Sequence, residues 1–159
     1  LTNPAGAPNQ VMGVFHSDLV GIQARVLKEL GSTHVMVVHG EDGLDEITLT
    51  GPTLVAELKR GFVTEFKIEP KQFGLDTAPL DAITAADKET SRKMVEQVLD
   101  NQPGPAKDIV MLNAGAAIYV SGLTTDLWGG VARAREMIES GQAKTKLEQL
   151  VKFTSAIKS

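Results

Sequence analysis

The feature that most constrains the fold is a short apolar run followed at once by a loop of glycines and carboxylates. The run Val35-Met36-Val37-Val38 is rich in β-branched residues and has no polar alternation. Such a run is typical of a strand that is buried on both faces, as strands inside a parallel sheet are. The loop that follows, residues 39–46, therefore lies at the carboxyl end of a buried strand, where open α/β folds bind their ligands.

A βαβ unit accounts for the N-terminal part of the chain. Residues 11–15 are apolar and predict a strand, and residues 34–38 predict the next one. Ser17 is a good N-cap and Gly31 a good C-terminal stop for a helix between them. That helix carries apolar residues at helical spacing: Leu19, Ile22, Val26, Leu27 and Leu30. Because the crossover in such a unit is right-handed, the two strands are parallel and their following loops meet at one edge of the sheet.

The pattern changes to period two from Ile47 onward, which predicts a β-hairpin at the side of the sheet. Lys59-Arg60-Gly61 is the expected turn, and the alternating positions are Leu54, Ala56, Leu58, Phe62, Thr64, Phe66 and Ile68. Residues 69–82 carry two prolines and are expected to form an ordered loop over the surface.

Helices are expected in the remainder of the chain. The first covers residues 86–99, where Met94, Val95, Val98 and Leu99 are expected to be buried, and the second covers residues 106–120. The second contains the small-residue run 114–117, which predicts close packing against the sheet. Thr125 is expected to cap a third helix with one apolar face formed by Leu127, Trp128, Val131 and Ile138. A fourth helix carries Leu147, Leu150 and Val151.

These elements predict an α/β fold with a mostly parallel sheet, an antiparallel hairpin and flanking helices. A chain of 159 residues suits one domain, so the whole of residues 1–159 is assigned to it. The chain begins at Leu1 rather than at a methionine and soon enters a strand, which suggests a piece of a longer protein.

Composition excludes several classes of function. The chain has no cysteine, which excludes disulfides, thiolate catalysis and Cys-ligated zinc, and His16, His34 and His39 are too scattered for a paired-histidine metal site. A net charge of −4 and 4% aromatic residues provide neither a basic stripe nor stacking aromatics for nucleic acid. No apolar run approaches the roughly 18 residues that span a bilayer, and no signal peptide opens the chain. A cytoplasmic protein is therefore expected.

The loop after the central strand contains four carboxylates within six residues: Glu41, Asp42, Asp45 and Glu46. Two like charges about 4 Å apart repel by about 4 kcal/mol at an effective dielectric of about 20, so the cluster needs water or a cation. Mg²⁺ is suited to it, because this ion is held by one or two carboxylates together with waters and substrate phosphates. The alternative is a solvated acidic turn. His39 either contacts a ligand or merely closes the strand.

Direct binding of phosphate by backbone amides has no support in the sequence. Neither of the glycine-rich phosphate motifs, GxGxxG or GxxxxGK[ST], occurs in the chain. Gly40 and Gly43 flank the acidic cluster, but acidic side chains repel phosphate unless a cation lies between them. A phosphate bridged by a metal ion is therefore favoured over a phosphate bound directly.

Several segments resemble the C-terminal half of the anthranilate phosphoribosyltransferase family. They are Asn3-Pro4-Ala5-Gly6, Val11-Met12-Gly13-Val14-Phe15, Val37-Val38-His39-Gly40-Glu41-Asp42-Gly43-Leu44-Asp45-Glu46, Leu49-Thr50-Gly51-Pro52-Thr53, Phe73-Gly74-Leu75 and Leu112-Asn113-Ala114-Gly115-Ala116. The resemblance runs in unbroken order from Leu1 to about Val151, and its most specific part is the string that ends in Asp45-Glu46.

This resemblance implies the α/β domain of the nucleoside phosphorylase and phosphoribosyltransferase type. It also implies an activity of tryptophan biosynthesis, in which the amine of anthranilate displaces diphosphate from C1 of 5-phosphoribosyl-1-diphosphate to give N-(5-phosphoribosyl)anthranilate. The adjacent Asp-Glu pair of the family binds Mg²⁺, and it corresponds here to Asp45 and Glu46. There the ion would neutralise charge on the diphosphate as it leaves.

The resemblance also indicates what these residues do not include. The family's glycine-rich phosphate loop, its Lys-His-Gly-Asn segment and the arginine for the anthranilate carboxylate lie upstream of the Asn-Pro-Ala motif. No catalytic residue is therefore assigned within this chain, and turnover by these residues alone is not expected. The helical domain through which a homodimer would form is upstream as well. Two or more strands of the complete sheet would also come from that missing half, so the sheet is expected to have an exposed or rearranged edge. Two alternatives stay open: a pyrimidine nucleoside phosphorylase-like enzyme, and a non-catalytic cation-binding or interaction module.

Overall fold

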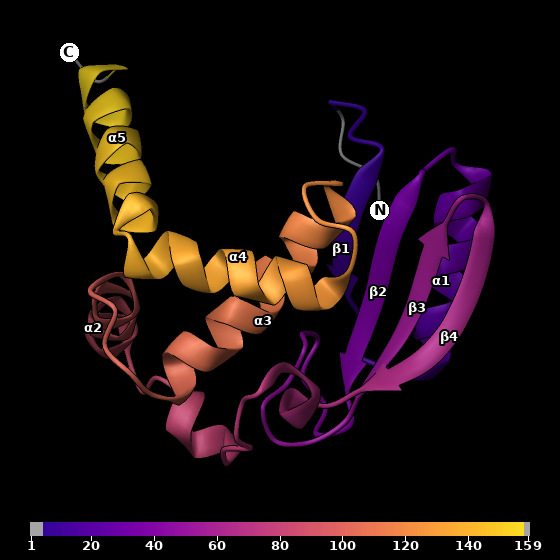
Figure 1. Ribbon diagram of the computed structural model, residues 1–159, viewed down its shortest axis with the longest axis horizontal. Coiled ribbons are helices and arrows are strands. Elements are labelled where there is room, and N and C mark those ends of the chain that lie inside the picture. Colours follow the sequence, from indigo (N-terminus) through magenta and orange to yellow (C-terminus); the bar gives the residue numbers. More distant parts are fainter. Residues whose placement is uncertain (1–4, 158–159) are drawn as a thin grey trace.

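The structure is a computed structural model, which describes residues 5–157 (Figure 1). Asn3 and Pro4 of the expected family motif lie outside these residues. The strands are β1 (Asn9–Gly13), β2 (His34–Gly40), β3 (Thr53–Lys59) and β4 (Phe62–Ile68). The helices are α1 (Asp18–Glu29), α2 (Lys88–Leu99), α3 (Pro105–Val120), α4 (Leu127–Glu139) and α5 (Gln142–Ile157). No helix among the described residues is long and apolar enough to cross a membrane.

The four strands form one sheet in the order β1-β2-β3-β4. The parallel pairing of β1 with β2 is confirmed, as is the antiparallel hairpin of β3 and β4. Because β3 also pairs with β2 in the antiparallel direction, the sheet within residues 5–157 is mixed and has one parallel pair, where a mostly parallel sheet was expected. The hairpin turns at Arg60 and Gly61, both of which have positive φ angles, as a two-residue turn matched to strand twist requires.

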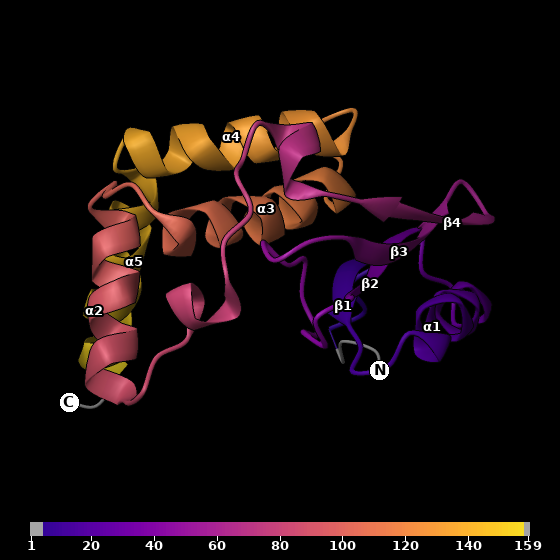
Figure 2. The ribbon, with the colours of Figure 1, turned by 90° about the horizontal axis from the view of Figure 1, so that it is seen from below.

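Each face of the sheet is covered by its own helices (Figure 2). On one face α1 buries Ala24 and Leu27 against Val35 and Val37 of β2. On the other face α3 packs against the sheet and α4 packs against α3. The apolar residues of β2 thus divide between two cores, which confirms that this strand is buried on both sides. Helices α2 and α5 lie at the end of α3 and α4 that is farther from the sheet (Figures 1 and 2).

Helix caps and strand bounds differ from expectation in places. Strand β1 ends at Gly13 and Phe15 is 79% exposed, so the strand lies earlier in the chain than residues 11–15. Ser17 occupies the N-cap of α1 but forms no capping hydrogen bond with its side chain, because its backbone is already helical. The cap of α4 is Asp126, whose carboxylate accepts a hydrogen bond from the N–H of Gly129, and not Thr125.

Fewer apolar residues of the C-terminal helices are buried than their sequence patterns predict. Val98, Val131 and Ile138 are buried as expected, but Val95 is 51% exposed and Trp128 is 63% exposed. Helix α5 has no buried residue. Apolar periodicity predicts a helix with one apolar face, but it does not predict whether another element covers that face.

Candidate active site at the Asp45-Glu46 loop

The loops that follow β1 and β2 meet at the same edge of the sheet, as the parallel pairing requires. A Cβ atom on Gly13 would overlap the backbone carbonyl of Asp45, so the absence of a side chain lets the acidic loop lie directly on the end of β1. Nδ1 of His39 is 2.8 Å from the carbonyl oxygen of Val14. That oxygen can only accept, so His39 donates through Nδ1 and, being buried, joins the two strand ends.

Asp42 organises the interior of the loop. Its Oδ1 accepts a hydrogen bond from the N–H of Leu44 at 3.1 Å, and its Oδ2 accepts from the hydroxyls of Thr48 at 2.6 Å and Thr50 at 2.8 Å. Burial raises the pKa of Asp42, but the hydrogen bonds from Thr48, Thr50 and Leu44 outweigh it and leave the pKa below its usual value. The carboxylate is therefore occupied within the loop and is not available to a ligand.

Of the other three carboxylates of the loop, one is also occupied by the protein and two are free. Oε1 of Glu41 accepts from Nζ of Lys67 on β4 at 2.6 Å. Asp45 and Glu46 are exposed, and neither carboxylate has a hydrogen bond or ion pair with any described residue. Of the four acidic side chains singled out in the sequence, the structure leaves the adjacent pair open to solvent and to ligands.

The backbone on both sides of this pair is held by other elements. The carbonyl of Leu44 accepts from the N–H of Gly40, at the end of β2, at 2.8 Å. On the other side Asn113 of α3 forms two bonds with one residue: its Oδ1 accepts from the N–H of Ile47 at 3.0 Å, and its Nδ2 donates to the carbonyl of Ile47 at 2.9 Å. Elements far apart in the sequence thus fix the segment that carries Asp45 and Glu46.

The donor set suits Mg²⁺ as a partial site. No group of three His, Cys, Asp or Glu side chains that could hold a metal ion occurs within residues 5–157. Two free carboxylates on a fixed backbone match the way proteins hold Mg²⁺, which keeps several waters and takes further oxygens from substrate phosphates. The residues present therefore fit an ion that is bound together with a phosphorylated ligand.

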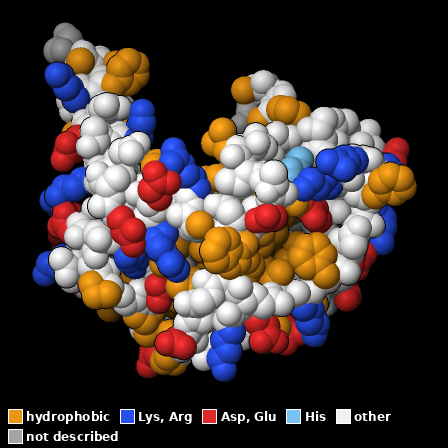
Figure 3. Space-filling model, in the orientation of Figure 1, with side chains coloured by type: hydrophobic (Ala, Val, Ile, Leu, Met, Phe, Trp, Pro, Cys, Tyr) orange, Lys and Arg blue, Asp and Glu red, His pale blue; other side chains and the backbone are white. Residues whose placement is uncertain are grey.

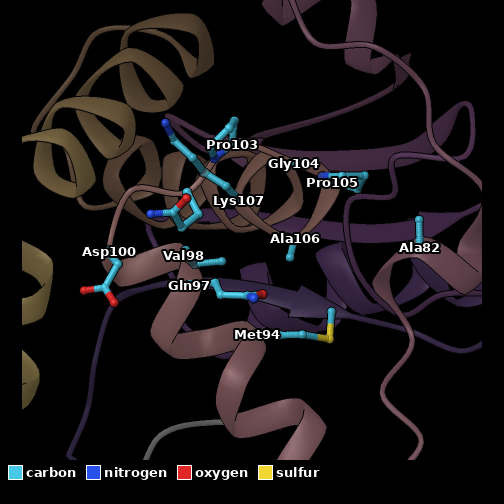
Figure 4. A pocket seen from close by; sticks show the side chains of 11 residues that line it. Ala82, Met94, Gln97, Val98, Asp100, Pro103, Gly104, Pro105, Ala106 and Lys107 are labelled. Atoms are coloured by element: carbon cyan, nitrogen blue, oxygen red, sulfur yellow. The ribbon is translucent and has the colours of Figure 1, made fainter.

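Glu46 also lies at the rim of an apolar hollow between α2 and α3. This hollow has a volume of 360 Å³, and its lining includes Ile83, Met94, Ile109 and Val110. A second cavity, of 640 Å³, opens between α2 and the start of α3 (Figure 4).

The charged groups that line the second cavity already have partners. Asp100 accepts a hydrogen bond from Lys144, and Lys107 donates one to Asn101 at 2.6 Å. Figure 4 shows Lys107 extending from the first turn of α3. The acidic pair, whose carboxylates are free and whose Glu46 lines the other hollow, is therefore the better candidate for ligand chemistry.

The sequence located the acidic pair but not the groups that hold it. Asn113 stands out in the sequence only through the family resemblance, and its partner Ile47 is 66 positions away in the chain. A polar residue inside the apolar stretch of α3 was the available signal, since a partly buried amide needs hydrogen-bond partners. His39 closes the strand through its bond to Val14, which is one of the two roles considered for it, and a contact with a ligand stays a prediction.

Comparison with known proteins gives these features a family context. The chain is 60% identical over 154 residues to the anthranilate phosphoribosyltransferase of Laribacter hongkongensis (strain HLHK9), a match that covers 97% of this chain and 45% of that protein. The enzyme of the same name from Nitrosomonas europaea is 55% identical over 158 residues, which cover 99% of this chain and 46% of that protein. The chain thus spans a little under half the length of these relatives.

Solved structures agree with the sequence comparison. The crystal structure of anthranilate phosphoribosyltransferase from Thermus thermophilus superposes with a TM-score of 0.81 at 38% identity, covering 89% of this chain and 41% of that one. The enzyme from Saccharomyces cerevisiae in complex with PRPP and Mg superposes with a TM-score of 0.82 at 27% identity, covering 93% and 43%. Residues 1–144 match the family described as "Glycosyl transferase family, a/b domain". Since this match includes most of the 159 residues, the chain belongs to that glycosyl transferase family.

Proposed function

We propose that this chain is the metal-binding part of an anthranilate phosphoribosyltransferase. In the reaction the amine nitrogen of anthranilate bonds to C1 of 5-phosphoribosyl-1-diphosphate, the bond from C1 to the diphosphate oxygen breaks, and the nitrogen loses a proton. The products are N-(5-phosphoribosyl)anthranilate and diphosphate, in tryptophan biosynthesis. The observation that carries the proposal is the free Asp45-Glu46 pair on a fixed backbone, in a chain 60% identical to an enzyme of that name.

Asp45 and Glu46 are the residues that would hold Mg²⁺. Bound there with the diphosphate, the ion would neutralise charge on the leaving group. The chain's own contribution is to present two carboxylates at a set position while Asp42 holds the loop closed through Thr48 and Thr50. The yeast relative was solved with PRPP and Mg, which supports this ligand pair. We further propose that the phosphate loop, the anthranilate site and a homodimer interface belong to the part of the relatives that this chain does not span.

The test is a double substitution, Asp45→Asn with Glu46→Gln, in a full-length protein made by joining this chain to the remaining part of the Laribacter hongkongensis relative. Loss of both charges should raise the Mg²⁺ concentration for half-maximal rate at least about tenfold, by analogy with outer-shell changes at metal sites, which cost about 10- to 100-fold. The KM for 5-phosphoribosyl-1-diphosphate should rise with it. Both side chains are exposed, so the melting temperature should stay within about 2 °C.

Glu41→Gln is the matched control, because Glu41 lies in the same loop but its carboxylate is paired with Lys67. The Mg²⁺ dependence of this variant should equal that of the parent. Normal activity of the double variant at limiting Mg²⁺ would show that the metal role is wrong and that the loop is a solvated acidic turn.

A further inference from the structure

The peptide planes next to Asp45 and Glu46 are each held by a hydrogen bond from another element. A peptide unit is planar from one Cα atom to the next. The carbonyl of Leu44, bonded to Gly40, lies in the plane that ends at the Cα of Asp45. The N–H of Ile47, bonded to Asn113, lies in the plane that begins at the Cα of Glu46. The amide of Asn113 therefore constrains the direction in which Glu46 leaves the backbone.

Asn113 is itself well placed to act as a fixed support. Its Nδ2 donates to the carbonyl of Ile109 at 3.1 Å as well as to Ile47, so all its polar atoms are used and its side-chain rotamer is set. The helix that carries it is attached to the sheet independently. At the other end of α3, the Tyr119 hydroxyl donates to Glu57 of β3 at 2.6 Å.

We propose that Asn113 is a positioning residue for the Asp45-Glu46 pair, an inference that rests on the proposed metal role of that pair. Ile47 is already anchored, because it is only 2% exposed and lies in the core between the sheet and α3. Asn113 is therefore not needed to keep the loop attached. What Asn113 adds is the orientation of the Glu46–Ile47 peptide. Without it both carboxylates keep their charge, but that of Glu46 is no longer held in one position relative to Asp45 and the cation.

The test measures metal affinity rather than turnover and uses the chain itself. Mn²⁺ is titrated into the protein in the presence of 5-phosphoribosyl-1-diphosphate, and free Mn²⁺ is followed by electron paramagnetic resonance. Asn113→Ala should raise the Kd for Mn²⁺ about tenfold, the low end of what outer-shell partners of metal ligands cost. Asn113→Leu, which keeps the branched shape and the helix but has no amide, should do the same if the alanine variant folds poorly.

Two controls separate positioning from loss of stability. Val120→Ala removes buried volume at the far end of α3, so it should lower the melting temperature while leaving the Kd for Mn²⁺ unchanged. In a Glu46→Gln background, Asn113→Ala should change the Kd by less than about twofold, because residues that act as one unit are not additive.

The outcomes distinguish this inference from the proposed function. If Glu46→Gln weakens Mn²⁺ binding and Asn113→Ala does not, the positioning role is wrong and the metal role stands. If Asn113→Ala weakens binding equally in both backgrounds, the residue acts on general stability and the inference is overturned. If Glu46→Gln leaves the Kd unchanged, both proposals are overturned.

Discussion

Asp42 and Asp45 have the same side chain in the same loop, and their surroundings give them different roles. Asp42 accepts hydrogen bonds from two hydroxyls and a backbone N–H, whereas Asp45 is exposed and its carboxylate has no partner among the described residues. A carboxylate whose lone pairs are filled by the protein supports the loop, and one whose lone pairs are open can bind a cation. The different roles of the two residues are set by their hydrogen-bond partners, since both are aspartates of the same loop.

Asp42 should contribute to the acid stability of the fold. Because its pKa is lower in the folded protein, its carboxylate stabilises the fold above its unfolded pKa of about 3.9, and this contribution is lost as pH falls through the lowered value. Asp42→Asn should reduce the free energy of unfolding at pH 7 by about 1 kcal/mol, the net worth of a hydrogen bond. The difference should shrink below about pH 4. Urea unfolding between about pH 7 and about pH 2.5 measures it.

Asp45→Asn is the matched control for this experiment, because no described residue bonds to its carboxylate. That variant should unfold as the parent does across the same pH range. An Asp42→Asn variant with undiminished stability at pH 7 would contradict the role given to Asp42.

The acidic pair and Asn113 differ in whether the local sequence determines their place in the site. The positions of Asp45 and Glu46 followed from the strand before them, since a loop begins where a buried run ends. The contact of Asn113 with Ile47 depends instead on how α3 lies across the sheet. Such placement is a property of the assembled fold, and no local pattern encodes it.

Among the elements, α3 and α4 pack through glycines. A Cβ atom on Gly130 would overlap the carbonyl oxygen of Gly115, and a Cβ atom on Gly115 would meet the backbone of Val131. The run 114–117 was expected to pack closely against the sheet. Ala116 does lie in the core between α3 and the sheet, but the close approach at Gly115 is to α4. A small residue predicts that another element approaches closely, but it does not predict which element that is.

Gly130→Ala should therefore destabilise the fold although alanine is the better helix former. Overpacking costs about 1–3 kcal/mol, and here a methyl group would press on backbone, which cannot rotate away as a side chain can. The gain in helix propensity offsets about 1 kcal/mol of this cost. Because the contact is with backbone, the cost should lie in the upper part of this range, and we expect a net loss of up to about 2 kcal/mol in chemical denaturation.

The neighbouring glycine is the control, since Gly129 occupies the same helix turn. A Cβ atom there would lie 3.3 Å from Oδ1 of Asp126, a side chain that can adjust. Gly129→Ala should change the free energy of unfolding by less than about 1 kcal/mol. If the two alanine variants are equally stable, the glycine contact between α3 and α4 is not a constraint.

For the whole molecule, the surface carries features of a part that packs against something else. β1 stands at the end of the sheet, and no second strand pairs with it within residues 5–157. An exposed edge left by strands of the missing half stays a prediction. Apolar side chains gather in the hollow between α4 and the hairpin (Figure 3), and α5 leaves its apolar residues exposed. The sequence predicted these elements and their apolar faces. It could not show which faces stay uncovered, because that depends on packing between distant segments.

The ion and the sugar diphosphate should bind to this chain cooperatively, and this separates an enzyme part from a cation-binding module. Two carboxylates alone are a weak site, because Mg²⁺ dehydrates reluctantly and is normally completed by phosphate oxygens. Isothermal titration calorimetry should therefore show a Kd for Mg²⁺ above about 1 mM without 5-phosphoribosyl-1-diphosphate. This Kd corresponds to a favourable binding free energy of less than about 4 kcal/mol. Adding the diphosphate should tighten binding of the ion, and Asp45→Asn with Glu46→Gln should abolish that gain.

The same samples test whether these residues can catalyse the transfer by themselves. Orienting two reactants supplies roughly 7–11 kcal/mol of rate enhancement, and the resemblance places the groups that would orient anthranilate in the part of the relatives that this chain does not span. The 159 residues should give no phosphoribosylanthranilate fluorescence, and joining them to the remaining part of the Laribacter hongkongensis relative should restore it. Micromolar Mg²⁺ binding without the diphosphate would favour the cation-binding module instead, and turnover by the chain alone would show that the essential groups lie within it.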